Sequence, residues 1–143
     1  DWDKGAIEGR KGTESITAAH WYGADLKPVS VDKSFKKDEE SLQLEDIKLN
    51  ILHTPGHTPG GICLYNEAEK ICISGDTLFV GSIGRTDGPK SSFQQLYDAI
   101  HSKLFTLPDD VVVYPGHNYG LHPSTTLGQE KIENPFLNSK MYY

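Results

Sequence analysis

Three reactive side chains constrain the fold most strongly, because each is preceded by glycine and placed just after a short, largely apolar segment. They are His57, Asp76 and His117. The segments before them, residues 48–52, 70–73 and 111–114, have the length and residue types of strands. Glycine lets the backbone turn sharply, and strand ends are fixed by the sheet. The sequence therefore predicts a sheet whose strand-end loops hold these three side chains in defined positions.

An alternation of apolar and polar residues predicts a first hairpin. Apolar residues recur at every second position on each side of a central polar pair: Leu42, Leu44, Ile47, Leu49 and Ile51. A two-residue turn at Glu45-Asp46 would pair Leu44 with Ile47 and Leu42 with Leu49. Their side chains would then form one apolar face across both strands.

Residues 62–65 and 70–73 predict a second hairpin about a turn at residues 66–69. A symmetric turn would place Tyr65 opposite Lys70, and Cys63 opposite Cys72. Two cysteines are too few for a disulfide-dense scaffold. We therefore expect both to be reduced, buried strand residues.

The clearest predicted helix runs from Ser91 to Leu104, with its apolar residues on one face: Phe93, Leu96, Tyr97, Ile100 and Leu104. Ser91 and Gln94 have the spacing of a capping box. Further helices are expected over residues 15–22 and 124–133, and a buried strand over 111–114. Strands followed by mixed strands and helices indicate an α/β layered fold, and the length suits a single domain over residues 1–143.

Charge and hydropathy exclude several classes of partner. The net charge of −6 argues against wide contact with nucleic-acid phosphates. It does not exclude a small anionic substrate, because a metal ion can reverse the local sign. The sequence has no apolar run of about 18 residues and no leader of the secretory type, so we expect a cytoplasmic protein without a membrane span.

Imidazole and carboxylate groups are the ligands that zinc and iron use in proteins. An aspartate can bridge two ions through its two oxygens, and two close ions can hold one hydroxide between them. His57, Asp76 and His117 are therefore candidate metal ligands, and their joint pattern is more specific than any one of them.

Residues 42–137 resemble the C-terminal part of a metallo-β-lactamase-fold hydrolase of the glyoxalase II-like branch. The motifs are HTPGHTPGG (53–61), SGDTLFVGSIGRTD (74–87), Phe-Thr-Leu-Pro before VVVYPGHNYG (105–120) and TLGQEKIENPFL (126–137). The resemblance implies an αββα sandwich, represented mainly by its C-terminal half. It also implies that His57 rather than His53 is a ligand, that Asp76 bridges the metals, and that His117 completes the second metal. The implied cofactors are two divalent ions, zinc first, with iron and manganese as alternatives.

The sequence departs from this family at one motif. The family's His-x-His-x-Asp-His motif, which supplies four more ligands, is absent, and His20 does not fit it. The chain thus holds three of the seven ligands that the resemblance implies. We expect the strand-rich half that carries the motif to lie upstream of Asp1. Residues 1–41 lie outside the matching motifs.

Other residues have two interpretations each. Arg85 and Asp87 either line the substrate pocket or form a structural ion pair beneath the metal loop. Tyr119 either hydrogen-bonds the substrate or is a packed aromatic residue, and Lys131 either meets a substrate carboxylate or is solvated. We expect no metal at the remaining histidines after the first motif begins: His53, His101 and His122. Asn138 stands where glutathione thioesterases of this fold tend to have a basic residue.

The resemblance implies an enzyme that hydrolyses a small-molecule thioester such as S-lactoylglutathione through a metal-bound hydroxide. A persulfide dioxygenase, with one iron held by two histidines and one aspartate, is the first alternative. The second is an inactive fragment that functions only beside its missing N-terminal half. Half a sandwich exposes an apolar sheet face, which predicts association with that half or with itself.

Overall fold

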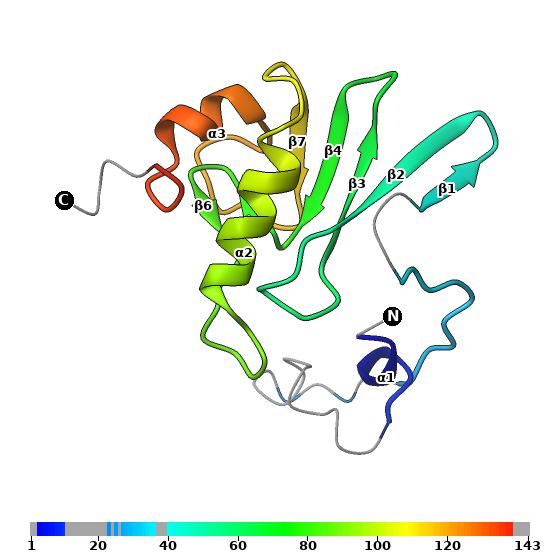
Figure 1. Cartoon of the computed structure of the whole chain (residues 1–143). Coiled ribbons are helices and arrows are strands. Elements are labelled where there is room, and N and C mark those ends of the chain that lie inside the picture. The colour runs from blue at the N-terminus through cyan, green and yellow to red at the C-terminus, as the bar shows by residue number, and fades with distance from the viewer. Residues whose placement is uncertain (1–2, 11–22, 24, 26, 37–39, 139–143) are drawn as a thin grey trace.

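The computed structural model of the chain describes residues 3–10, 23, 25, 27–36 and 40–138. Its main feature is a six-stranded sheet in the order β1-β2-β3-β4-β7-β8, in which only β4 and β7 pair in parallel (Figure 1). The strands are β1 Ser41–Leu44, β2 Ile47–His53, β3 Ile62–Asn66, β4 Ile71–Gly75, β7 Val112–Pro115 and β8 Thr125–Thr126. A separate hairpin is formed by β5 Leu78–Phe79 and β6 Ser82–Ile83.

The first hairpin has the predicted register. Leu44 pairs with Ile47, and Leu42 pairs with Leu49. Glu45 adopts a φ of 51°, which is the left-handed conformation that a two-residue hairpin turn needs at its first position. The prediction is confirmed although Glu-Asp is not a favoured pair for such a turn.

The predicted register of the second hairpin is wrong by two residues. Tyr65 pairs with Cys72, because β3 continues to Asn66 and the turn begins only after it. The Asn66 side-chain oxygen accepts a hydrogen bond from the amide of Glu69 at 2.9 Å, which closes this turn. A two-residue shift keeps every side chain on its face of the sheet. Cys63 and Cys72 are accordingly both buried and free, as predicted.

The long predicted helix is divided in two. Helix α2 spans Phe93–Ala99 and continues as the π-helix η3 over Ile100–Leu104. Its cap is Ser92, whose hydroxyl accepts a hydrogen bond from the amide of Gln95 at 3.3 Å. The predicted capping box of Ser91 and Gln94 is therefore wrong by one position.

Two shorter helices complete the described part. Helix α3 spans Leu127–Glu133 and begins later than predicted, because residues 125–126 form strand β8. Helix α1 spans Lys4–Ile7. The helix predicted over residues 15–22 lies outside the described residues. That the whole chain forms one domain stays a prediction.

The core lies between one face of the sheet and the helices. Figure 1 shows α2 and α3 beside the β4–β7 half of the sheet, away from its β1–β2 end. Helix α2 and η3 contribute Leu96, Ile100 and Leu104, which are all fully buried. They pack in one cluster with side chains from the strands, the β5–β6 hairpin and the C-terminal region: Cys63, Tyr65, Cys72, Leu78, Ile83, Val111, Val113, Leu127 and Leu137.

The opposite face of the sheet is also apolar, and we call it the open sheet face. The strand register places these residues on it: Leu42, Leu44, Ile47, Leu49, Ile51, Ile62, Leu64, Ile71, Ile73, Val112 and Tyr114. Several of them remain exposed, including Ile47 at 51%, Ile73 at 45% and Tyr114 at 46%. Helix α1 and residues 31–35 lie near Ile51 and Ile62, where they line a hollow of about 180 Å³. Within the described part of the chain, no helix is long and apolar enough to cross a membrane.

Candidate metal centre

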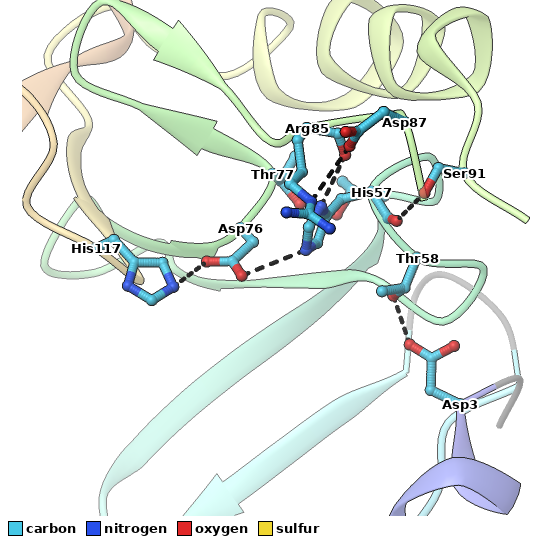
Figure 2. Close-up of polar contacts among 10 residues, drawn as sticks. Asp3, His57, Thr58, Asp76, Thr77, Arg85, Asp87, Ser91 and His117 are labelled. Carbon is cyan, nitrogen blue, oxygen red and sulfur yellow. Dashed lines mark hydrogen bonds and ion pairs between the residues drawn. The ribbon is translucent and has the colours of Figure 1, made fainter. Parts of the chain in front are cut away.

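The three candidate ligands come together at one edge of the sheet. Strands β2, β4 and β7 run in the same direction, so the loops that follow them meet at this edge. Figure 2 shows His57 and His117 on either side of Asp76. The Nε2 atom of His57 lies 3.4 Å from Oδ2 of Asp76, and Nε2 of His117 lies 3.3 Å from Oδ1. Each carboxylate oxygen thus faces a different imidazole.

Glycine permits the close approach of the β4 and β7 loops. The amide of Gly116 donates to the carbonyl of Gly75 at 2.8 Å, which extends the parallel pairing into the site. A Cβ atom at position 116 would lie 2.7 Å from Oδ1 of Asp76. Only glycine leaves room for the carboxylate where it now lies.

The loop that carries His57 is held by helix α2 and by the neighbouring β4 loop. Gly56 has a φ of 139°, and a Cβ atom there would lie 2.4 Å from Leu96, so glycine lets the helix pack directly on this loop. The Ser91 hydroxyl donates to the carbonyl of His57 at 2.8 Å. The buried hydroxyls of Thr54 and Thr77 hydrogen-bond each other at 2.9 Å and join the His57 loop to the Asp76 loop.

The orientation of His57 suits a ligand that coordinates through Nε2. Its Nδ1 donates to the backbone carbonyl of Arg85 at 2.8 Å, since a carbonyl oxygen can only accept. This bond fixes the tautomer and directs the Nε2 lone pair toward Asp76. Metal-binding histidines are commonly oriented in this way by a carbonyl or carboxylate partner.

Asp76 and His57 perturb each other's pKa values. The hydrogen bond that protonated His57 donates to the Asp76 carboxylate raises the pKa of His57, against the opposing effect of partial burial. The same hydrogen bond, aided by His117, lowers the pKa of Asp76. A proton and a metal ion compete for the same Nε2 lone pair, so the carboxylate that attracts one also favours the other.

His117 lies in an aromatic group at the edge of the site. Its ring stacks on Tyr119 with a centroid distance of 4.9 Å and an angle of 11°. Phe79 contacts both rings, with ring-centroid distances of 6.1 Å to His117 and 5.2 Å to Tyr119. Tyr119 is 72% exposed and adjoins a candidate ligand. Its predicted hydrogen bond to substrate stays a prediction.

The other predicted site residues are placed as follows. Arg85 and Asp87 form an exposed ion pair at 3.3 Å. Both of their predicted roles, in a substrate pocket or in a structural ion pair beneath the metal loop, stay predictions. Nε2 of His53 lies 2.9 Å from the carbonyl of Pro59, and His101 stacks on Tyr97 at 4.0 Å. Lys131 pairs with Asp109 at 2.5 Å.

Sequence reasoning missed Asp3, which lies against the His57 loop. Its carboxylate accepts a hydrogen bond from the Thr58 hydroxyl at 2.5 Å (Figure 2). It also accepts one from the amide of Gly60 at 2.9 Å. Asp3 and Thr58 are 55 positions apart. No local signal connects positions so distant. The buried threonines were missed as well, although both stand inside the motifs.

The donor set fits a carboxylate shared between two metal ions. Each half of the centre contains one imidazole nitrogen and one oxygen of Asp76. A zinc ion in a catalytic site is usually held by three protein ligands. Among residues 3–10, 27–36 and 40–138, no group of three or more His, Cys, Asp or Glu side chains converges to hold one ion. A metal ion at these residues would therefore need further ligands.

Comparison with known proteins gives a consistent result. The family model of the metallo-beta-lactamase superfamily matches residues 2–117. Hydroxyacylglutathione hydrolase GloC of Haemophilus influenzae is 45% identical over 109 residues, which cover 76% of this chain and 50% of that protein. The chain spans about half the length of the curated relatives that it matches.

Two solved structures resemble the chain in both fold and sequence. TTHA1623 in a di-iron-bound form has a TM-score of 0.75 and 32% identity, and the match covers 95% of this chain and 62% of that one. ETHE1 from Myxococcus xanthus has a TM-score of 0.66 and 36% identity, and the match covers 70% of this chain and 44% of that one.

Proposed function

This chain belongs to the metallo-beta-lactamase superfamily, and we propose that it forms the Asp76 side of a dinuclear metal centre in a thioester hydrolase. The predicted family and α/β fold are confirmed. Membership of this superfamily and the likeness to a relative named as a hydrolase favour a metal-dependent hydrolase. We propose in addition a thioester substrate, two metal ions, and roles for His57, Asp76 and His117 as their ligands.

One observation carries the proposal: each oxygen of Asp76 faces a different histidine. If Asp76 and both histidines bound a single ion, their ligand atoms would point to one common position. The opposed arrangement instead suits a bridging ligand with one histidine on each side. The similar structure of TTHA1623, described as di-iron-bound, supports a proposal with two ions.

The relative named hydroxyacylglutathione hydrolase supports a thioester such as S-lactoylglutathione as substrate. Two bound divalent ions would supply a nucleophile from water at neutral pH and polarise the thioester carbonyl. Water adds to this carbonyl, the carbon–sulfur bond breaks, and a carboxylic acid and a thiol are released. In this chain, the Arg85 carbonyl orients His57, and Tyr119 borders the site beside His117.

A mononuclear iron oxygenase is the second candidate. Two histidines and one aspartate are the ligand set that the resemblance to persulfide dioxygenases implies. The chain has residues of these types in His57, His117 and Asp76, although among the described residues no three such side chains converge on one point. The similarity to ETHE1 covers 70% of this chain. Metal stoichiometry and oxygen uptake separate this candidate from the hydrolase.

We further propose that the remaining ligands are supplied by a polypeptide that packs on the open sheet face. This face ends at the edge where His57 and Asp76 lie, because β2 and β4 contribute to both. Its exposed apolar residues, such as Ile47 and Ile73, favour burial by a second layer. In this proposal the 143-residue chain alone is not the complete enzyme.

The test combines this chain with the part of the Haemophilus influenzae relative that lies outside the match. We expect two divalent ions per complex by elemental analysis, together with thiol release from S-lactoylglutathione. Asp76→Asn should abolish both, whereas Asp109→Asn, which changes an exposed ion pair, should leave both unchanged. One iron with oxygen uptake would replace the hydrolase by the oxygenase. A stable complex without metal or turnover would contradict both.

A further inference from the structure

Glu130, on helix α3, is a buried carboxylate whose hydrogen-bond donors are amides. It is 2% exposed. Both of its oxygens accept from the amide of Gly81, at 3.2 and 3.1 Å, and Oε2 also accepts from the Asn134 side chain at 2.8 Å. Burying a carboxylate costs free energy that only good hydrogen bonds offset. Such a residue on helix α3 therefore calls for an explanation.

Asn134 completes the arrangement one turn later on the chain. It is fully buried, and its side-chain amide also donates to the carbonyl of Ser82 at 3.0 Å. Glu130 and Asn134 together thus hold adjacent backbone groups, the amide of Gly81 and the carbonyl of Ser82. We call this pair the hairpin clamp, because these groups belong to the turn and second strand of the β5–β6 hairpin.

The β5–β6 hairpin supports the His117 loop. Phe79 of β5 is 5% exposed, and its ring contacts those of His117 and Tyr119. Val80 packs against the same loop, since a Cβ atom at Gly120 would lie 2.5 Å from its Cβ. Asp76 also lies two positions before the hairpin begins. A shift of the hairpin would therefore displace the surroundings of His117.

We propose that Glu130 is a positioning residue, which holds the β5–β6 hairpin so that Phe79 fixes the ring of His117. The chain of contacts runs from Glu130 to Gly81, along the hairpin to Phe79, and from Phe79 to His117. The functional meaning of this inference rests on the proposed role of His117 as a metal ligand. The geometry itself is independent of any metal.

The test compares Glu130→Gln with Glu133→Gln by NMR on the full chain without metal. The variants remove a charge from the same helix, but Glu133 is an exposed residue paired with Gln129. In Glu130→Gln we expect the amide of Gly81 to exchange about tenfold faster, through loss of a charge-assisted hydrogen bond. The ring resonances of His117 and Tyr119 should shift because the position of Phe79 changes, while those of His101 stay fixed. Glu133→Gln should change none of these signals.

Two results would overturn the inference. Faster exchange at Gly81 with unchanged His117 resonances would show a role in folding only, and unchanged signals throughout would show no clamp. If Glu130→Gln does not fold, Glu130→Asp keeps the charge but withdraws the carboxylate by one methylene, and the same signals decide. Because no metal is present, failure here is distinct from failure of the proposed function.

Discussion

At the scale of single residues, Asp76 is distinguished by its two oxygens, which face opposite imidazoles at 3.4 and 3.3 Å. The Asp76 side chain lies between these two rings. It also lies close to the backbone at Gly116, where a side chain would contact its Oδ1 atom. Its position is therefore sensitive to small changes in the backbone of the neighbouring loop.

Gly116→Ala tests that sensitivity. The added Cβ atom would lie 2.7 Å from Oδ1 of Asp76 and must displace either the carboxylate or the loop. We expect zinc affinity, measured by calorimetric titration, to fall about tenfold or more, as for loss of other groups that orient ligands. Circular dichroism should remain that of the folded chain. Unchanged affinity in a folded variant would show that the carboxylate position does not matter.

Asp3→Ala tests the contact between the N-terminal segment and the His57 loop. Because two hydrogen bonds to a carboxylate are lost, we expect the free energy of unfolding to fall by about 1–3 kcal/mol, and exchange at Gly60 to accelerate. Asp109→Ala, which removes an exposed ion pair, should cost at most about 1 kcal/mol. Equal losses in the two variants, measured by chemical denaturation, would argue against a specific role for Asp3.

The sequence indicated the three candidate ligands but not the residues that support them. His57, Asp76 and His117 are recognisable because each follows a strand and a glycine, and both signals are local. Asp3 and Glu130 are not recognisable, since their partners lie 55 and 49 positions away. An acidic residue near the start of the chain, or on a helix with polar neighbours, is typical of a solvated surface.

At the scale of elements, loop length decides which registers can be predicted. With a two-residue turn at Glu45-Asp46, only one register of the two strands places their apolar residues on the same face. The structure has this register. The longer turn after Asn66 allows pairings that differ by two residues and preserve both faces, so the apolar pattern cannot choose between them. The change from α-helix to π-helix at Ile100 could not be predicted, because the spacing of apolar residues up to Leu104 is that of a continuous α-helix.

The start of helix α2 provides a test at this scale. Ser92→Ala should accelerate amide exchange at Gln95 and lower stability by about 1 kcal/mol, because the cap is lost. Ser91→Ala should leave exchange at Gln95 unchanged, since that hydroxyl contacts the carbonyl of His57 instead. The reverse result would restore the capping box at Ser91 and Gln94.

At the scale of the whole molecule, the sheet has one face packed on helices and one largely apolar face that remains partly exposed. Such an arrangement is typical of one layer pair in a larger sandwich. The comparisons agree, since the matched part is about half of each curated relative. The predicted fold class was accessible from the order of strands and helices. The apolar face was predicted from the alternation in its first hairpin.

The open sheet face should make the isolated chain associate. We expect concentration-dependent self-association in sedimentation velocity, which Ile47→Lys combined with Ile73→Lys should reduce. Ile132→Lys is the matched control, because Ile132 is 71% exposed on helix α3, beyond this face. If the control reduced association equally, or if the wild-type chain stayed monomeric, the open sheet face would not be the contact surface.

The central claim, that Asp76 joins two metal half-sites, is tested most directly by zinc titration of the histidine-labelled chain followed by NMR. The account predicts that His57 and His117 respond together while His53 and His101 do not, and that Asp76→Asn removes both responses. Replacing either histidine by alanine should leave the response of the other. A response at only one of the two histidines in the wild-type chain, or an undiminished response in Asp76→Asn, would contradict the account.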